Sequence, residues 1–203
     1  AIQLTQDEEW QILDPTDGLA DISHGTIRVL HDKSFVDDPT RIFRAVKYSI
    51  RFGFSIDEKT GKLIGNCIKS NYINKISGNR ILSEVSQILE ENNFKTNIQL
   101  LSSLGILSSI HPKLKIGDAL LDKLTKLNND TKEDKSKLLT LFFSDINPEN
   151  IDGICQRLDV NPKTVKILHG IQTIKQNTKS LSKTKIINSE LMMLLDKLDI
   201  ESI

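Results

Sequence analysis

Cysteine and histidine are too few and too scattered in this 203-residue chain to suggest a disulfide framework or a metal site. The two cysteines, Cys67 and Cys155, have no CxxC spacing and no adjacent histidine, so both are predicted to be buried free thiols. The four histidines lack HExxH spacing, and we expect them to be surface or capping residues. No apolar run approaches the roughly 20 residues of a membrane helix. We expect a soluble, cytoplasmic protein without membrane contact.

Aromatic residues are also scarce, at 5% of the chain, whereas apolar residues reach 38% and charged residues 27%. A core built mainly from leucine and isoleucine suits packed helices better than a sheet, so the expected fold class is all-α. Periodicity and capping signals predict helices at residues 38–52, 57–70, 78–91 and 96–104, and from Asn147-Pro148 and Asn161-Pro162 onward.

Two stretches have the composition of connections. Residues 128–130 are predicted to form a loop, and residues 175–185 a flexible link to a last amphipathic segment at 189–198. At the other end, residues 1–5 and 10–13 have the pattern of two short strands. Two strands alone are marginally stable, so we expect a remnant of a sheet whose other strands lie upstream. The first residue is alanine, which also suggests a cut chain.

Charge is balanced overall, at a formal net charge of zero, but five of the six arginines fall in the first 80 residues. A local basic patch is therefore expected rather than a protein that coats nucleic acid through its total charge. On a helix over residues 38–52, one face carries polar and basic side chains: Arg41, Arg44, Tyr48 and Arg51. The opposite face is apolar: Ile42, Phe43, Val46 and Ile50.

Asp38 and Arg41 can be interpreted in two ways. They can form an ordinary pair that supports the first turn of a solvated basic helix. Alternatively, a carboxylate that only accepts hydrogen bonds, beside a guanidinium that only donates them, can match the pairing edge of cytosine or adenine. Uracil and guanine would place a carbonyl acceptor against the carboxylate and an N–H donor against the guanidinium. Such mismatches can favour one substrate over another by orders of magnitude.

Several segments closely resemble the bacterial tRNA nucleotidyltransferase and poly(A) polymerase family. They are residues 18–22 (GLADI), 25–31 (GTIRVLH), 34–45 (SFVDDPTRIFRA), 51–54 (RFGF) and 77–81 (SGNRI) with Glu84. The resemblance covers about residues 1–92. It implies a nucleotide-binding set made of Asp37, Asp38, Arg41 and Arg44. It also implies a head–neck hinge at Asp14, Gly18 and Asp21, and RNA, phosphate or neck-supporting roles for Arg28, Arg51, Arg80 and Glu84.

The family's reaction joins an RNA 3′ hydroxyl to the α-phosphate of a nucleotide, with metal ions held by carboxylates. The carboxylates near the two strands, Asp7, Glu8, Glu9 and Asp14, do not follow the family's metal-binding pattern. The resemblance therefore implies that Mg²⁺ is bound by a catalytic head, in the same or a separate chain. This chain would hold no catalytic residue or metal ligand, would select CTP and ATP, would bind the tRNA 3′ end or other RNA, and would be inactive alone.

In family terms the expected parts are a head remnant and linker (1–30), a nucleotide- and RNA-binding neck (31–92), a helical body (93–174) and a tail (175–203). Two alternatives stay open: a poly(A) polymerase fragment, because it would share the neck motif, and a non-catalytic helical RNA-binding module. Single positions also have plainer interpretations. Asp14-Pro15 with Gly18 can be a simple turn, and Arg80 with Glu84 can brace one helix.

Overall fold

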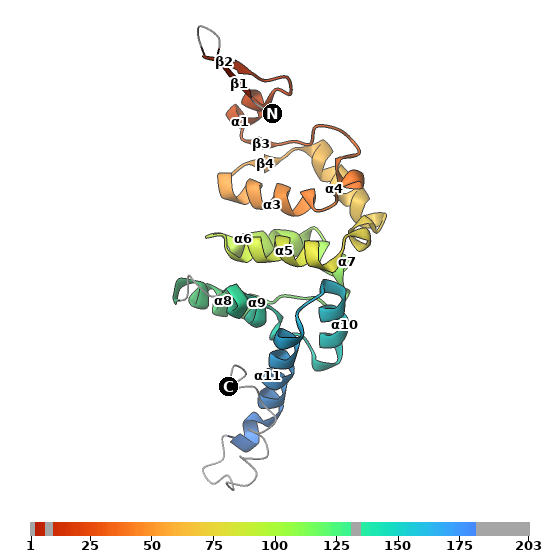
Figure 1. Cartoon of the computed structure of the whole chain (residues 1–203), viewed down its shortest axis with the longest axis vertical. Coiled ribbons are helices and arrows are strands. Elements are labelled where there is room, and N and C mark those ends of the chain that lie inside the picture. Colours follow the sequence, from red (N-terminus) through yellow and green to blue (C-terminus); the bar gives the residue numbers. More distant parts are fainter. Residues whose placement is uncertain (1–2, 7–9, 131–134, 182–203) are drawn as a thin grey trace. The chain divides into compact units, whose positions relative to one another are not determined.

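The computed structural model describes residues 3–6, 10–130 and 135–181, which fold mainly as helices joined by short loops (Figure 1). The all-α expectation is confirmed. Every described helix is too short or too polar to cross a membrane.

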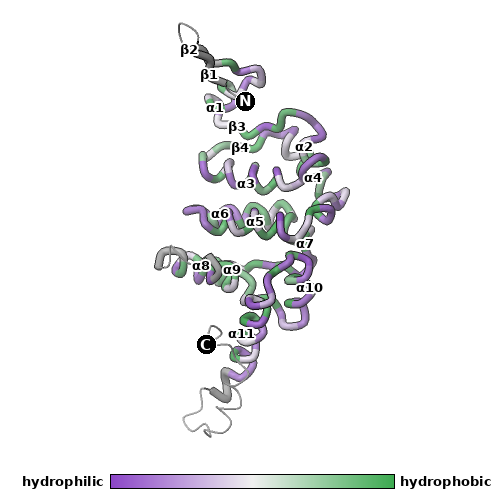
Figure 2. Tube along the Cα trace, viewed as in Figure 1, coloured by the Kyte–Doolittle hydropathy of each residue, from purple (hydrophilic) through white to green (hydrophobic). Residues whose placement is uncertain are grey.

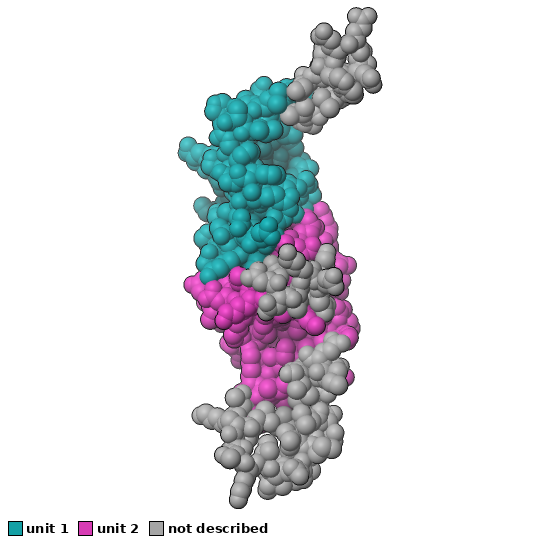
Figure 3. Space-filling view, turned by 90° about the vertical axis from the view of Figure 1, so that its left-hand side faces the viewer, with its two compact units in different colours: residues 1–76, 91–109 teal, residues 77–90, 110–203 magenta. Residues whose placement is uncertain are grey.

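Two compact units divide the chain (Figure 3). Residues 1–76 and 91–109 form unit 1, and residues 77–90 and 110–203 form unit 2. The chain thus leaves unit 1 for one helix, returns, and then passes into unit 2. The four parts expected from the sequence are a division by role, and they stay a prediction.

Unit 1 contains the described strands and a set of mostly short helices. In chain order these are β1 (Gln3–Gln6), β2 (Trp10–Leu13), α1 (Gly18–Ser23), β3 (Thr26–Ile27), α2 (Ser34–Asp37), α3 (Arg41–Phe52), β4 (Ser55–Ile56), α4 (Glu58–Lys69), the 3₁₀ helix η1 (Tyr72–Lys75), α6 (Phe94–Ser103) and α7 (Ile106–Ile110), whose last residue belongs to unit 2.

The described strands form two separate pairs. β1 and β2 are antiparallel, with Gln3 opposite Leu13, so the two predicted strands do pair. Whether they belong to a larger sheet stays an expectation. β3 and β4 form a parallel pair, with Thr26 opposite Ser55, which the sequence did not predict. Strands of two residues are too short to leave a period-two pattern.

Helix α3 follows the predicted capping signals but begins three residues late. Asp38 is extended (φ −148°, ψ 96°), and its Oδ1 accepts from the Thr40 amide at 3.1 Å, as an N-cap carboxylate does. The turn after it is closed by a short-range bond from Arg41 N to Asp38 O (3.2 Å), so regular helix starts only at Arg41. Gly53, in the left-handed region at φ 67°, ends the helix as predicted.

The core of unit 1 gathers on the apolar face of α3. Ile42, Phe43 and Val46 are fully buried, and α3 packs against α6. Figure 2 shows hydrophobic and hydrophilic residues alternating along α3, in agreement with its two faces. Burying such a set stabilises a domain by roughly 1.5–3 kcal/mol per large side chain. Turning α3 so that these side chains faced solvent would lose that stabilisation. The opposite, polar face of α3 is therefore the one exposed to solvent.

The described part of unit 2 contains five helices: α5 (Gly78–Leu89), α8 (Asp118–Asp130), α9 (Lys135–Phe143), α10 (Pro148–Leu158) and α11 (Pro162–Leu181). Helix α5 packs on α9 and α10, and α11 packs on the same two. The buried Gln172 side chain of α11 donates to the carbonyls of Ser144 (2.7 Å) and Ile146 (3.1 Å) just after α9. These bonds satisfy carbonyls that the end of a helix leaves without partners.

Most of the predicted helices are confirmed. Helices α4, α5, α6, α10 and α11 lie where they were expected. The Asn161 side chain caps α11, because its Oδ1 accepts from Thr164 N at 2.8 Å. Two predictions are wrong. Residues 128–130 continue α8, and residues 175–181 continue α11, although Asn, Ser and Thr have weak helix propensity. Residues 182–185 and the segment 189–198 lie outside the described residues.

Candidate functional site

A cleft of about 370 Å³ opens on unit 1 beside the polar face of α3. Its lining comes from β3 and the loop after it, from α2 and from α3. The lining residues whose side chains carry a polar group are Arg28, His31, Ser34, Arg41, Arg44 and Tyr48. A concave site of roughly 300–1,000 Å³ with a few convergent polar groups is typical of small-molecule binding.

Helix α3 supplies cations without any acidic residue, since its sequence is RIFRAVKYSIRF. Arg41 is half-buried and its Nη1 donates to the Ser34 carbonyl at 3.3 Å, which holds the guanidinium against α2. Arg44, one turn later, is exposed and has no hydrogen-bond or ion-pair partner among the described residues. The cleft therefore combines one positioned guanidinium with one that is available to an anion.

The two aspartates before α3 have different environments. Asp38 is half-buried, and Thr40 donates to its Oδ1 through both the amide (3.1 Å) and the hydroxyl (2.7 Å). Asp37 is exposed, and its carboxylate lies 3.9 Å from His31 Nε2. Neither aspartate lines the cleft, whereas Arg41 and Arg44 do.

The predicted hinge residues form a capped short helix. Asp14 accepts from the amides of Gly18 (2.9 Å) and Leu19 (2.7 Å), so its carboxylate caps α1. These two amides favour the charged form and hold the pKa of Asp14 below its usual range. Asp17, which lies between Asp14 and Gly18 in the sequence, has a left-handed backbone at φ 56°. The turn interpretation of residues 14–18 is thus correct as a description of local structure.

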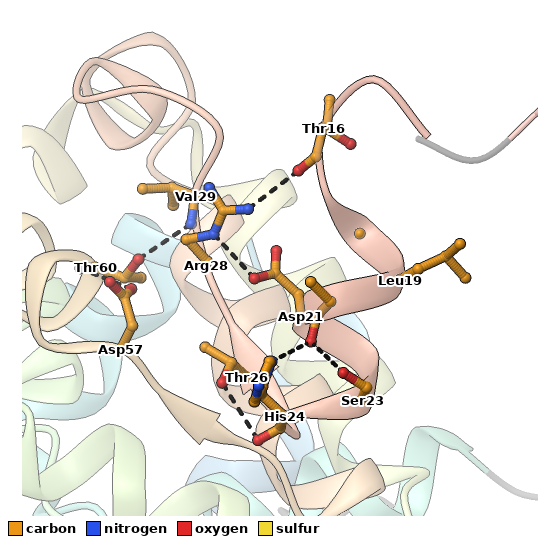
Figure 4. Close-up of polar contacts among 12 residues, drawn as sticks. Thr16, Leu19, Asp21, Ser23, His24, Thr26, Arg28, Val29, Asp57 and Thr60 are labelled. Atoms are coloured by element: carbon orange, nitrogen blue, oxygen red, sulfur yellow. Dashed lines mark hydrogen bonds and ion pairs between the residues drawn. The ribbon is translucent and has the colours of Figure 1, made fainter. Parts of the chain in front are cut away.

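Arg28 connects this linker to the cleft (Figure 4). Its Nε donates to Asp21 Oδ1 at 3.0 Å, and its Nη2 donates to the Thr16 carbonyl at 3.1 Å. The bond to Asp21 raises the pKa of the Arg28 guanidinium. In the following residue, Val29 N donates to the Thr60 hydroxyl of α4 at 3.1 Å. The cleft wall after β3 is therefore fastened on one side to α1 and on the other to α4.

The other predicted support residues lie away from the cleft lining. Arg51, at the end of α3, forms a two-pronged ion pair with Glu91, with Nε 3.0 Å from Oε2, and this pair raises the pKa of Arg51. Arg80 and Glu84 are in unit 2 on α5, where Arg80 is exposed and Glu84 half-buried.

Sequence reasoning missed several members of the cleft. Among them are His31, which was expected to be a surface or capping residue, and Tyr48, which was given no role. His31 lies in the loop after β3, a two-residue strand that left no periodic signal. Tyr48 could have been selected, because it already shared a helix face with Arg41 and Arg44.

The described residues offer no obvious Mg²⁺ site. Among them, no three His, Cys, Asp or Glu side chains gather closely enough to hold a metal ion. The linker carboxylates are already engaged, Asp14 by backbone amides and Asp21 by Arg28. Mg²⁺ needs several oxygens that converge on one point, and these two carboxylates do not supply them.

Comparison with known proteins identifies relatives over nearly the whole chain. Residues 53–116 match the family model described as "Probable RNA and SrmB- binding site of polymerase A". The A-adding tRNA nucleotidyltransferase of Geobacter sulfurreducens is 31% identical over 90% of this chain and 23% of its own length. The Multifunctional CCA protein of Neisseria gonorrhoeae is 31% identical over 55% of this chain and 27% of its own length.

Solved structures share the fold. The Thermotoga maritima CCA-adding enzyme complexed with tRNA superposes with a TM-score of 0.72 at 24% identity, over 94% of this chain and 49% of that one. A tRNA nucleotidyltransferase complexed with a primer tRNA and an incoming ATP analog gives 0.67 at 22% identity, over 94% and 59%. The chain thus spans about a quarter of the length of these curated relatives and about half of the solved chains.

The family model covers residues 53–116, which begin just after α3 and include β4, α4, η1, α5, α6 and α7. Taken together, sequence and fold show that this chain belongs to the CCA-adding tRNA nucleotidyltransferase and poly(A) polymerase family and includes its RNA-binding body region.

Proposed function

We propose that this chain is the nucleotide-selecting and RNA-holding part of a cytoplasmic RNA 3′-end nucleotidyltransferase that adds CCA, or part of it, to tRNA. The cleft beside α3 takes the incoming CTP or ATP. The observation that carries the proposal is the convergence of Arg41, Arg44 and Tyr48, from one face of one helix, in a cleft of about 370 Å³.

Base selection would come from Asp38 and Arg41. Arg41 reaches the cleft in a fixed position, and Asp38 lies in the turn just before it with a half-buried carboxylate. A donor beside an acceptor complements the amino group and ring nitrogen of cytosine or adenine. With uracil or guanine, buried groups of like kind would be opposed, and each such mismatch costs about 1–3 kcal/mol. Asp37 would assist from the preceding position.

Phosphate binding would come from the other cations of the cleft. Arg44 is exposed and without a described partner, and a guanidinium fork suits phosphate oxygens. Arg28 lies in the same lining. Solved relatives include complexes with CTP, with ATP and with tRNA, which supports the same ligands here.

Nucleotide transfer itself would need a catalytic head, as part of the same protein or as a partner chain. When bound, Mg²⁺ would supply charge stabilisation for the attacking and leaving oxygens. The linker carboxylates Asp14 and Asp21 are engaged by backbone amides and by Arg28, so we assign the metal to that head. This chain's residues would bind and orient the nucleotide and the RNA end. Alone, it would transfer no nucleotide.

Equilibrium dialysis of the pure chain with each of the four nucleoside triphosphates tests the pocket. CTP and ATP should bind more tightly than UTP and GTP, and Asp38→Ala or Arg41→Ala should remove the preference. Lys69→Ala, which removes an exposed cation at the end of α4, is the matched control and should retain it. Equal binding of all four nucleotides by the unaltered chain would refute base selection.

The need for a catalytic head is tested by measuring the transfer of labelled nucleotide to a tRNA that lacks its CCA end. The chain with Mg²⁺ should incorporate nothing, whereas addition of a relative's catalytic head should restore incorporation. Incorporation by the chain alone would contradict the assignment of the metal. A poly(A) polymerase fragment, which the description of the matching family model favours, would instead extend RNA with AMP only. A non-catalytic RNA-binding module would respond to neither the head nor Asp38→Ala.

A further inference from the structure

Leu30, in the loop after β3, is a large hydrophobic residue on the surface of unit 1. Its exposed fraction is 64%, and it also belongs to the lining of the cleft beside α3. A single exposed leucine on an open surface needs no explanation. An exposed leucine at the edge of a concave site is different, because it will contact whatever fills that site.

Hydrogen bonds hold the backbone on both sides of Leu30. On one side, Val29 N donates to the Thr60 hydroxyl of α4 at 3.1 Å (Figure 4). On the other, the His31 carbonyl accepts from Ser34 N, the first amide of α2, at 3.1 Å. A restrained backbone loses less conformational entropy when a ligand binds to it, so more of an apolar contact remains as affinity. The loop thus presents Leu30 to the cleft at a small entropic cost.

Helix α3 brings positive charge to the same cleft. Arg41 and Arg44 both line it, and neither forms an ion pair with a described carboxylate. Arg28, which also lines the cleft, does not add to this charge because Asp21 neutralises it. No Asp or Glu occurs among the described residues of the lining. The cleft therefore favours an occupant that combines an anionic part with an apolar one.

We propose that Leu30 packs on the ring face of the base of the nucleotide bound in the cleft. The inference rests on the proposed function, which places CTP or ATP there. A nucleotide carries its hydrogen-bonding groups on the edge of the base, whereas the ring face is a flat surface that every base has. The ring face suits an aliphatic side chain, and the phosphates suit guanidinium groups without a carboxylate partner. Leu30 would thus contribute affinity for the base without reading its identity.

Charge favours this occupant over an apolar protein segment. A segment that reached Leu30 within the cleft would also cover Arg41 and Arg44, and burying cations without anionic partners is costly. An acidic segment would avoid this cost. The experiment separates that case from a nucleotide, because the dialysis cell contains no second protein.

Equilibrium dialysis of the full chain with ATP, CTP and inorganic triphosphate tests the contact. Leu30→Ser should lower the affinity for ATP and for CTP about three- to tenfold, because the apolar contact with the base is lost. Inorganic triphosphate carries the phosphate charges without a base, so its affinity should not change. Leu30→Met, which retains an apolar side chain of similar volume, should bind all three ligands as the unaltered chain does. Leu19→Ser, at an exposed leucine outside the cleft lining, is the matched control and should also leave them unchanged.

Nucleotide preference separates Leu30 from the residues proposed to read the base edge. Because the ring face is common to all bases, Leu30→Ser should retain the preference for CTP over UTP and for ATP over GTP. Asp38→Ala or Arg41→Ala should instead remove that preference. A loss of preference in Leu30→Ser would contradict a contact with the ring face.

Unchanged affinity for ATP and CTP in Leu30→Ser would overturn the inference and leave base selection standing. An equal loss for inorganic triphosphate would overturn it as well, since the leucine would then act on the shape of the cleft. If the unaltered chain bound no nucleotide, both proposals would fail. Leu30 is exposed, so its variants should fold, and circular dichroism checks that they do.

Discussion

Arg28 and Asp21 form an ion pair, with Nε 3.0 Å from Oδ1, that joins the linker helix α1 to the wall of the cleft (Figure 4). The second bond from Arg28, to the Thr16 carbonyl, fixes the start of the same helix. Because α1 buries no side chain, these polar bonds and the Asp14 cap are the main described restraints on it. The linker is therefore held by a few breakable contacts.

Arg28→Ala should release α1 without unfolding unit 1. The pair is partly exposed, so the thermal midpoint should change little, but the amides of α1 should exchange with solvent faster. Hydrogen exchange measured by mass spectrometry or NMR checks this. Asp21→Asn should give the same acceleration, and the double variant no further one, because both remove one interaction. Additive effects would show that Arg28 acts on α1 through another contact.

Asp14 should make the cap of α1 sensitive to acid. Its folded-state pKa is lowered by the Gly18 and Leu19 amides, so the stabilisation is present above the unfolded value of about 3.9 and is lost as pH falls through the lower folded value. NMR titration of these two amides should show a midpoint below about 3.9. Asp14→Asn should abolish that titration. A midpoint at or above the ordinary value would contradict the cap.

Two glycines in helices should respond oppositely to alanine. A Cβ at Gly78, the first residue of α5, would lie 2.6 Å from the Leu158 carbonyl carbon and would overlap the Arg157 carbonyl. Gly78→Ala should thus lower the free energy of unfolding by about 1–3 kcal/mol. A Cβ at Gly61, inside α4, meets nothing within 4 Å, so Gly61→Ala should raise it by about 0.5–1 kcal/mol. Urea denaturation measures both.

Cys67 and Cys155 should be unreactive in the native protein. They are 2% and 3% exposed, which confirms the predicted burial, and burial raises the pKa of each thiol to about 11. Ellman's reagent at pH 8 should therefore label them only after denaturation. Because the unfolded thiols ionise first, stability should be unaffected below about pH 8.5 and should fall as pH rises toward 11. Cys67→Ala with Cys155→Ala should remove that part of the decline.

Arg44 should bind phosphate at little cost to the fold. Arg44→Ala removes an exposed guanidinium without a described partner, so the free energy of unfolding should remain within about 0.5 kcal/mol of the original. Nucleoside triphosphate affinity should drop about tenfold, as expected for loss of one charge-assisted contact of about 1.5 kcal/mol. Arg44→Lys should recover part of it. An unchanged affinity at low salt would place the phosphates elsewhere.

Where capping chemistry was explicit, the sequence was sufficient to predict the elements. Asn161 before α11 was predicted as a cap, and it accepts a hydrogen bond from the amide three residues later. Asn147 was predicted from the same signal and does precede α10, but its side chain makes no cap bond. Local patterns failed at two other places. Residues 128–130 favour a loop by composition but continue α8, and the β3–β4 pair depends on partners almost 30 residues apart.

The cleft was predictable only in part. The spacing of Arg41, Arg44 and Tyr48 places them on one helix face from sequence alone. The other wall, which includes Arg28 and His31, is brought there by bonds to α1 and α4 that no local pattern indicates. The roles of Asp37 and Asp38 stay predictions, which the dialysis experiment addresses.

The two-residue parallel pair β3–β4 has a mechanical consequence. Its bonds run from Ser55 N to Gly25 O (2.8 Å) and from Asp57 N to Ile27 O (3.2 Å), so the segment right after α1 is tied to the segment right after α3. A pull on the linker would be transmitted through about two rungs of backbone to the far end of the arginine-bearing helix. The linker is thus coupled to the end of α3 by backbone hydrogen bonds as well as by the chain that connects them.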